Sequence, residues 1–549
     1  MENSQDFVIK NGVLTRYKGH SGDVTVPEGI TEIGEDAFCG RTMLASVTIP
    51  ESVTKIRSEA FEGCTSLTSV TIPKDVVEIG GRAFSGCTSL TSMTIPKGVM
   101  EIGSAAFSGC TSLTSVTIPE GASIWWEAFE GCTGLTDVVI AAGITNRSWE
   151  LFSDTPWLKN LGEFAVVNHI LLKYQGAGGD VTIPEGVTEI GWSAFEDCTG
   201  LTSVTIPEGI TKIEGEAFKG CASLTSVAIP KSVTYIGGNA FKYCKGLTGV
   251  TIPEGITKIR RDTFYGCTSL TSVTIPEDVT KIEGEAFGGC TNLTSVTIPD
   301  GVVKIEDRAF RDCKGLTSVT IPEGIIKIGN GVFEGCTGLT GVAIPESVME
   351  IGKGAFKGCT GLASVAIPES ITKIGDSVFE GCTGLTGVAI PESVMEIGKS
   401  AFKGCTGLTS VTIPERVKKI GKSVFSDCYP VLIAPHIPIS GFDAVNKPGA
   451  CAGFAKLYFG KTELDEEIKA DYLKYIKGKK TQFYPLAVEH EALLQLMFAE
   501  KMIPRKDIDP LLEECDQQNN IAAKAAVLEY VGKSLEPMDP LKEFKLKNL

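Results

Sequence analysis

A 23-residue period governs most of this chain and restricts the folds that it can adopt. Each copy contains Leu-x-x-Val-x-Ile-Pro followed by Val-x-x-Ile-Gly-x-x-Ala-Phe, as in residues 67–84. The phenylalanines of this motif are Phe38, Phe61, Phe84, Phe107, Phe129 and Phe152, and then one at every 23rd position from Phe195 to Phe425. Repeats of roughly 20–29 residues with this aliphatic spacing form solenoids that stack one strand per copy in parallel. The chain is therefore predicted to be a leucine-rich-repeat parallel β stack.

The side chains of one copy show how it should fold. Alternate strand residues take opposite faces, so Leu67, Val70 and Ile72 should point into the coil while the Thr and Ser between them face solvent. Pro73 has no N–H to donate, and the strand should stop there. Gly80 is expected to occupy a turn with positive φ. One copy cannot bury its apolar side chains alone, and neighbouring copies must complete the core.

The copies depart from the generic leucine-rich repeat in one respect. That repeat has Asn or Cys three residues after the last strand aliphatic residue, where this chain has Asp75, Gly98 or Ser232. With the recurring Ile-Gly-x-x-Ala-Phe-x-x-Cys, residues 23–428 resemble the BspA-type (Treponema-type) leucine-rich-repeat family. That family contains surface adhesins and many proteins of unknown function from bacteria and protists. The resemblance implies a binding protein and leaves its partner open.

Two β-hairpins are predicted to divide the repeats. Residues 7–17 place two apolar runs about Asn11 and Gly12, which is typical of a hairpin and would cap the first coil. Residues 164–174 repeat this pattern 157 positions later, with Phe38 and Phe195 in register. We predict a hairpin cap at 1–22, a first array at 23–160, an internal hairpin seam at 161–179 and a second array with its terminal cap at 180–436.

Residues 437–549 are predicted to form a small all-α domain. Amphipathic patterns indicate helices over 443–459, 486–502, 508–515 and 521–531. Thr462 and Asp465 resemble a capping box before a further helix that contains Ile468, Tyr472 and Ile476. Short helical pairs of this kind resemble ankyrin-like or other α-hairpin modules, although no full motif is present.

All the tryptophans fall around the internal hairpin, at Trp125, Trp126, Trp149, Trp157 and Trp192. Aromatic side chains are enriched at binding hot spots, which makes this seam the candidate partner-binding site. The alternative is that large rings fill volume where the regular packing pauses. Trp126 is expected to be more exposed than Trp125, because Trp125 takes the place of a turn residue.

The solvent-facing strand residues are short, polar and monotonous, with Thr-Ser-Thr in most copies. Such a face suits a repetitive ligand, such as a glycan or a fibrous protein. It is equally explained by the preference of β-branched Thr for strands. The net charge of −16 and the absence of a Lys/Arg run argue against nucleic acid or an anionic membrane and favour cationic partners.

The N-terminus and the hydropathy of the chain indicate its location. The first residues lack the basic and apolar regions of a Sec signal peptide. No run of 18 apolar residues is present, so no membrane insertion is expected. Both features favour the cytoplasm, and surface display would need a non-Sec route.

Fifteen of the 18 cysteines stand three residues after a repeat phenylalanine, from Cys64 to Cys428. We expect them to form a buried ladder of small apolar groups. Parallel Cβ vectors would strain disulfides between neighbouring copies, and no Cys-x-x-Cys pair favours a metal. Unpaired thiols in this number suit a reducing compartment.

Catalytic motifs are not evident. Cys451 and Cys515 are the candidate nucleophiles of the helical segment, but Cys515 has acidic neighbours and both lie on apolar helix stripes. The histidines are His20, His169, His436 and His490, and none belongs to a metal or catalytic motif. The prediction is a non-catalytic scaffold without cofactor or metal that recognises protein or glycan, with cell-surface or host adhesion as a special case. The alternative is an effector or regulatory enzyme whose activity lies in residues 437–549.

Overall fold

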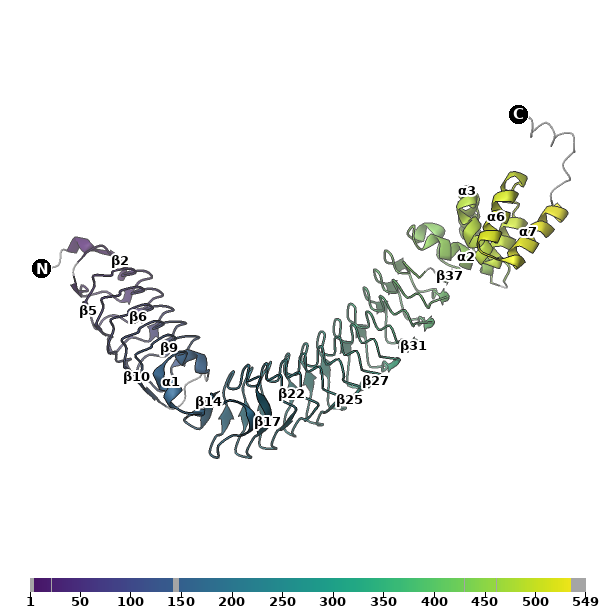
Figure 1. The fold of residues 1–549 in the computed structure, drawn as a ribbon. Helices are drawn as coiled ribbons and strands as arrows, with labels where there is room; N and C mark the ends of the chain where they lie inside the picture. The colour runs from purple at the N-terminus through teal and green to yellow at the C-terminus, as the bar shows by residue number, and fades with distance from the viewer. Residues whose placement is uncertain (1–3, 21, 142–147, 429, 461, 535–549) are drawn as a thin grey trace. The chain divides into compact units, whose positions relative to one another are not determined.

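The computed structural model describes residues 4–20, 22–141, 148–428, 430–460 and 462–534 (Figure 1). The chain forms two compact units, one of residues 1–256 with 262–268 and the other of residues 257–261 with 269–549. Repeats build the first unit, and both repeats and helices build the second. The predicted repeat solenoid with C-terminal helices is confirmed.

Each regular coil contributes two short strands. In the coil that begins at Phe61 these are β7 (Ser69–Thr71) and β8 (Glu78–Ile79), so the coil has two parallel ladders where the sequence predicted one. Partners lie one period apart, as when Val47 pairs with Val70. Leu67, Val70 and Ile72 are buried as predicted, and the Thr and Ser between them are exposed. The ladder ends before Pro73, which cannot donate a hydrogen bond.

The first unit has these strands. The Ser/Thr ladder contains β3 (Asp23–Thr25), β5 (Ser46–Thr48), β7, β10 (Ser115–Ile118), β12 (Asp137–Ile140), β15 (Gly179–Thr182), β17 (Leu201–Thr205), β19 (Ser226–Ala228) and β21 (Gly249–Thr251). The opposite ladder contains β4 (Glu32–Ile33), β6 (Lys55–Ile56), β8, β9 (Glu101–Ile102), β11 (Ser123–Ile124), β16 (Glu189–Ile190), β18 (Lys212–Ile213) and β20 (Tyr235–Ile236).

The second unit continues both patterns. Its Ser/Thr ladder contains β23 (Ser272–Thr274), β25 (Ser295–Thr297), β27 (Ser318–Thr320), β29 (Gly341–Ala343), β31 (Ser364–Ala366), β33 (Gly387–Ala389), β35 (Ser410–Thr412) and β37 (Val431–Ile433). The opposite strands are β22 (Lys258–Ile259), β24 (Lys281–Ile282), β26 (Lys304–Ile305), β28 (Lys327–Ile328), β30 (Glu350–Ile351), β32 (Lys373–Ile374), β34 (Glu396–Ile397) and β36 (Lys419–Ile420).

Both predicted hairpins are present. Strands β1 (Phe7–Lys10) and β2 (Val13–Tyr17) pair antiparallel, as do β13 (Phe164–Val167) and β14 (Ile170–Tyr174). The second strand of each hairpin pairs in parallel with the first coil that follows it. Each hairpin therefore covers the open edge of a ladder.

Stacked phenylalanine rings fill the coils. Phe61 and Phe84 lie 5.0 Å apart between centroids with their planes 3° from parallel. In the first unit this column ends at Phe152, whose ring meets Trp157 edge-on at 4.7 Å. A new column starts at the second hairpin, where Tyr174 stacks on Phe195. The hairpin thus interrupts the aromatic core of the first unit as well as its ladder.

The expectation that Gly80 has positive φ is wrong. A Cβ at Gly80 would lie 2.5 Å from the carbonyl carbon of Arg57 in the preceding coil, so this glycine permits the close approach of two backbones. Positive φ occurs instead at Arg82 (54°) and Gly86 (70°), in the turns around Phe84.

The cysteine ladder lies beside the phenylalanine column. Cys64 and Cys87 are buried free thiols, and each Sγ donates a hydrogen bond to the carbonyl of the phenylalanine in the preceding coil, at 3.1 and 3.2 Å. Burial raises the pKa of Cys64 and Cys132 to about 12. These thiols therefore act as buried hydrogen-bond donors as well as small packing groups.

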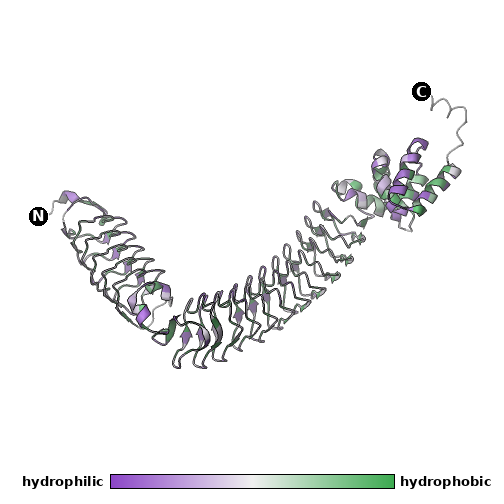
Figure 2. Ribbon diagram, viewed as in Figure 1, coloured by the Kyte–Doolittle hydropathy of each residue, from purple (hydrophilic) through white to green (hydrophobic). Residues whose placement is uncertain are grey.

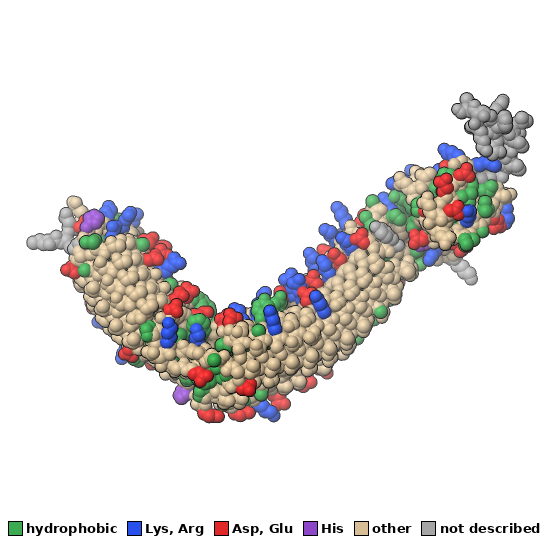
Figure 3. Space-filling view, in the orientation of Figure 1, with side chains coloured by type: hydrophobic (Ala, Val, Ile, Leu, Met, Phe, Trp, Pro, Cys, Tyr) green, Lys and Arg blue, Asp and Glu red, His purple; other side chains and the backbone are tan. Residues whose placement is uncertain are grey.

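Threonine hydroxyls connect neighbouring coils beside the Ser/Thr ladder. Thr91 donates its hydroxyl to the carbonyl of Thr68 at 3.3 Å, and Thr114 donates to Thr91 in the same way. In the second unit, the face that carries β25, β27 and β31 is formed almost wholly by uncharged polar side chains and backbone, while charged side chains gather along an edge (Figure 3).

The C-terminal segment is helical as predicted, with shifted boundaries. Its helices are η3 (Ile439–Gly441), α2 (Lys447–Tyr458), α3 (Glu466–Gly478), η4 (Lys480–Phe483), α4 (Tyr484–Glu489), α5 (Glu491–Ala499), η5 (Arg505–Asp507), α6 (Ile508–Gln517) and α7 (Ile521–Ser534). The shorter helices of the first unit are η1 (Ser4–Asp6), η2 (Trp149–Phe152) and α1 (Pro156–Asn160). Figure 2 shows hydrophobic and hydrophilic residues mixed on the C-terminal helices, as amphipathic helices require.

Two of the predicted helix boundaries need correction. Asp465 itself caps α3 by accepting hydrogen bonds from the N–H groups of Glu467 and Ile468, so the proposed pairing with Thr462 is replaced by a single capping residue. The helix predicted over 486–502 is broken at His490 into α4 and α5. Among the described residues, no helix is both long and apolar enough to cross a bilayer.

Candidate functional site

The tryptophans occupy related positions in successive coils of the first unit. Trp126, Trp149 and Trp192 each stand three residues before the phenylalanine of their coil, and Trp125 precedes Trp126. In the coils of Trp126 and Trp192 this position follows the two-residue strand, whereas Trp149 begins η2 and packs partly against the core. Trp157 differs, because it lies in α1, is only 8% exposed and packs on Phe152.

Two of these rings are open to solvent. Trp125 is 47% exposed and Trp126 43% exposed, so the expectation that Trp126 would be the more exposed of the two is wrong. The Trp125 indole donates a hydrogen bond to Glu101 at 2.8 Å, which holds it across the neighbouring coil. Trp157 therefore fills volume, whereas Trp125 and Trp126 are exposed at the surface.

The remaining rings join this surface to the second array. Trp126 meets Trp192 edge-on, with centroids 5.9 Å apart and planes at 73°. A Cβ at Gly215 would overlap the ring of Trp192, so this glycine leaves room for the indole. Trp149 donates its indole N–H to the carbonyl of Ser193 at 3.0 Å. We define Trp125, Trp126, Trp149 and Trp192 as the tryptophan seam.

A lysine shows how the seam accommodates a cation. The Lys173 ammonium lies 3.3 Å from the centroid of Trp149, on the face of the ring. Burial lowers the pKa of Lys173. A cation over an indole face is stabilised by the ring quadrupole, and the gain is larger where water is excluded.

Carboxylates surround the tryptophan seam. The pKa of Glu150 is raised by burial and by the nearby charges of Glu196 and Glu216. The pKa of Glu130 is raised by burial, then by Glu127 and Asp154. The neighbouring charges repel the ionised forms of Glu130 and Glu150, and a cation placed among them would relieve that repulsion.

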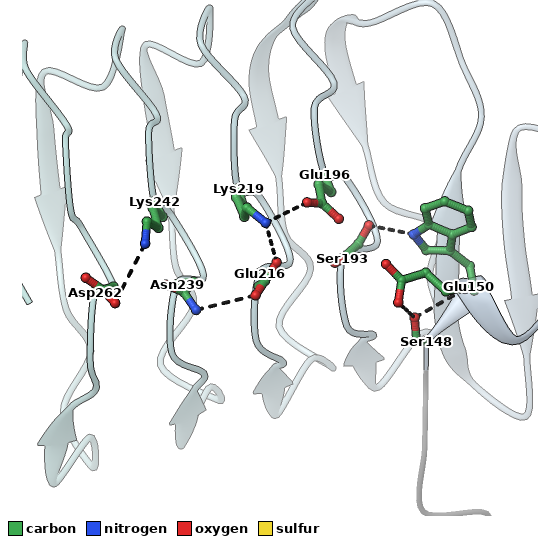
Figure 4. Close-up of polar contacts among 10 residues, drawn as sticks. Ser148, Glu150, Ser193, Glu196, Glu216, Lys219, Asn239, Lys242 and Asp262 are labelled. Carbon is green, nitrogen blue, oxygen red and sulfur yellow. Dashed lines mark hydrogen bonds and ion pairs between the residues drawn. The ribbon is translucent and has the colours of Figure 1, made fainter. Parts of the chain in front are cut away.

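A polar ladder leads away from the tryptophan seam along the turns (Figure 4). Lys219 bridges Glu196 and Glu216 at 2.8 and 2.6 Å, and Asn239 donates to Glu216 at 3.4 Å. Desolvation opposes the charge of Lys219, but its two carboxylate partners outweigh this and raise its pKa. These acids are thus partly neutralised, whereas Glu150 accepts only from Ser148 in this view.

The repeats of this chain match a known protein family. A model of the BspA-type leucine-rich-repeat region matches residues 17–136, 54–170, 174–292, 257–386 and 304–432, which is most of the chain. The chain belongs to the BspA-type leucine-rich-repeat family. No curated protein matches it.

Several solved structures are similar to this BspA-type chain. A leucine-rich-repeat protein from Bacteroides ovatus is 27% identical, with 75% of this chain and 92% of that chain covered and a TM-score of 0.32. A leucine-rich cell surface protein from Faecalibacterium prausnitzii is 30% identical, covering 71% and 91%, with a TM-score of 0.30. The T. pallidum leucine-rich-repeat protein is 31% identical over 35% of this chain and 82% of its own, with a TM-score of 0.27.

The other cysteines and histidines that could carry chemistry in this BspA-type chain lie in environments that do not activate them. Burial raises the pKa of Cys451, and burial together with Asp516 raises that of Cys515, so neither thiol is activated. Burial lowers the pKa of His436 and His490. Within the described ranges, no three His, Cys, Asp or Glu residues gather as metal ligands would. His20 and His169 are exposed at the hairpins.

Sequence reasoning found the tryptophan seam but missed its charge. Glu150, Glu196 and Glu216 come from three different coils, and the inserted hairpin separates Glu150 from the other two in sequence, so only the fold brings them together. Aligning the coils on their phenylalanines would have placed Trp126, Trp149 and Trp192 at one repeat position. The same reading could not have shown that Trp157 turns inward.

Proposed function

We propose that this protein is a non-catalytic binding scaffold whose tryptophan seam recognises a basic segment of a protein partner. The observation that carries the proposal is the exposure of Trp125 and Trp126 on a seam that also holds Glu130 and Glu150, whose pKa values are raised by burial and by neighbouring carboxylates. Indole rings supply area and a face for cations, and the carboxylates supply charge. The net charge of −16 assists long-range attraction of such a partner.

The charge of the tryptophan seam can be tested by collisional quenching, since every tryptophan of the chain is at or beside it. Caesium ions should quench tryptophan fluorescence more strongly than iodide, because the surrounding acids attract one and repel the other. Neutral acrylamide gives the uncharged reference, and 0.5 M sodium chloride should reduce the difference. Equal quenching by both ions would contradict an acidic seam.

Binding at the tryptophan seam is tested with a nonapeptide of alternating lysine and leucine. We expect the peptide to change tryptophan fluorescence, and Trp126→Ala to weaken its binding about tenfold or more, as for a hot-spot aromatic residue. Trp157→Phe is the matched control, because Trp157 is buried and should leave affinity within about twofold. Equal affinity of Trp126→Ala and the unaltered protein would refute the proposed site.

A second candidate is glycan binding by the Ser/Thr face. Thr91 and Thr114 use their hydroxyl hydrogens on backbone carbonyls, which leaves oxygen lone pairs in register along an uncharged surface. A repetitive polymer with hydroxyl donors would match that register. Binding of the protein to insoluble polysaccharides, unaffected by Trp126→Ala, would favour this candidate over the tryptophan seam.

The reduced thiol ladder also bears on where the protein works. We propose that the chain works in a compartment that keeps its thiol ladder reduced, with surface adhesion as the alternative. Protease shaving of intact producing cells, followed by detection of peptides from the tryptophan seam, separates the two.

The proposed domain limits are supported by two features of the fold. The interrupted aromatic column at Phe152 and Trp157 supports the division at 160 and 180, and the start of the helices supports that at 436.

A further inference from the structure

A groove in the second unit lies apart from the tryptophan seam. It has a volume of about 1170 Å³ and runs over strands β26 and β28 and the turns that follow them, from Arg261 to Ser377. These residues belong to six successive coils, so the groove is about 24 Å long at roughly 4.8 Å per coil. Its volume exceeds the roughly 300–1000 Å³ of small-molecule pockets and suits an extended chain segment.

Two aliphatic side chains form an exposed row on this groove. Val303 and Ile326 line it and are 59% and 61% exposed, on adjacent coils. The same repeat position holds Thr280 one coil before Val303 and Thr372 two coils after Ile326. Thr suffices at this position for the coil to form, so folding alone does not require aliphatic residues there.

The acids of the groove are already engaged. Glu306 pairs with Lys281 at 2.9 Å and with Lys304 at 3.1 Å; burial opposes its charge, but these lysines outweigh burial and lower its pKa. Asp307 accepts two hydrogen bonds from Asn330, from the backbone N–H at 2.8 Å and from the side-chain amide at 3.0 Å.

The remaining acids of the groove are also paired, whereas its basic residues are in excess. Glu285 pairs with Arg308, and Glu334 with Arg311, at 3.6 and 3.7 Å. The groove is lined by six basic and four acidic residues, although the whole chain carries −16. Lys353 forms no ion pair with any residue that the structure describes, so its ammonium group remains available.

We propose that this groove binds an acidic, aliphatic segment of a partner protein in extended conformation. Val303 and Ile326 would contact its aliphatic side chains, and Lys353 and Lys357 its carboxylates. About seven residues at roughly 3.3 Å each span the groove. The site is independent of the tryptophan seam, whose carboxylates would repel the same segment.

An internal duplication supplies a matched control. Residues 332–362 and 378–408 are identical except for Gly354 and Ser400, so Lys353 and Lys357 have counterparts in Lys399 and Lys403 outside the groove. Lys357 and Lys403 each pair with an acid of the next coil, Glu380 at 3.6 Å and Asp427 at 3.9 Å, although these two acids occupy different repeat positions. Charge reversal at the two pairs therefore changes net charge equally in nearly the same local setting.

The test uses fluorescence anisotropy with a fluorescein-labelled nonapeptide of alternating glutamate and leucine. Lys353→Glu with Lys357→Glu should lower affinity at least about tenfold, and Lys399→Glu with Lys403→Glu less than about twofold. Equal losses in the two variants would show a long-range charge effect and overturn the site. No binding to the unaltered protein at 50 mM salt would also overturn it.

The aliphatic row is tested separately. Ile326→Thr should weaken binding about threefold or more, whereas Met395→Thr, at the same repeat position outside the groove, should not. If sedimentation shows self-association that Lys353→Glu abolishes while the peptide fails to bind, a second copy of the chain occupies the groove and the proposal is wrong. The lysine peptide and Trp126→Ala report on the tryptophan seam, so failure there leaves this result unaffected.

Discussion

Above pH 9 we expect the repeats to lose stability steeply, to a greater degree than any single substitution would cause. Burial raises the pKa of five ladder thiols from 9.0 to about 12: Cys64, Cys132, Cys244, Cys336 and Cys382. In the unfolded chain these thiols ionise near 9, while the folded chain keeps them protonated. The stability that comes from keeping these thiols protonated is complete below pH 9. It is lost as pH rises towards 12, by roughly 1.4 kcal/mol per pH unit for each thiol.

Urea unfolding followed by circular dichroism at pH 8, 9, 10 and 11, with reductant present, measures this loss. The triple variant Cys64→Ala, Cys87→Ala and Cys110→Ala should be less stable at pH 8, because three buried thiols and their hydrogen bonds are removed. Its stability should nevertheless fall less steeply with pH. Cys39→Ala, at an exposed position, removes one thiol outside the buried ladder and should reduce the slope less than the triple variant does. An unaltered slope in the triple variant would assign the alkaline loss to other groups.

The fold could be predicted because one pattern is repeated many times. Leu67, Val70 and Ile72 alternate with polar residues, and this spacing determines which face is buried. The hairpins were equally clear, since Asn11 and Gly12 favour the positive φ angles that the turn requires, 51° and 77°. Local signals of this kind depend on a few neighbouring residues, so they can be recognised without knowledge of the tertiary structure.

Gly80 shows where local reasoning fails. A glycine in a repeat suggests a turn, but the cause here is the backbone of the preceding coil, 22 or 23 residues away. The positive φ angle falls on Arg82, a residue type that carries no such signal. Contacts between coils, and not the sequence of one coil, determine both positions.

The candidate sites were predictable to different degrees. Tryptophan content alone drew attention to the seam, yet the inward turn of Trp157 depends on the packing of α1 against Phe152. The groove in the second unit gave no signal, because its charged residues are spread over five coils and acids such as Glu306 are paired with lysines. Such a site emerges only when the partners of each charge are known.

Gly453→Ala should cost about 3 kcal/mol and release α2 from the last coil. Helix α2 lies against β37, and a Cβ at Gly453 would overlap the carbonyl of Leu432. Gly449, one turn earlier, faces the carbonyl of Pro430 in the same way. Two glycines four residues apart thus let a helix backbone touch a strand backbone, and even one methyl group must force them apart.

Hydrogen exchange of peptides from α2 and β37 measures this separation directly. Exchange should rise in both elements of Gly453→Ala, while coils around Phe333 remain protected because each coil contacts only its neighbours. The matched control is Gly532→Ala in α7, where an added Cβ meets no atom within 4 Å. Loss of glycine flexibility should make that variant about 0.5–1 kcal/mol more stable. Unchanged exchange in Gly453→Ala would mean that α2 can shift without leaving β37, and that the glycine pair does not fix the contact between the helices and the repeats.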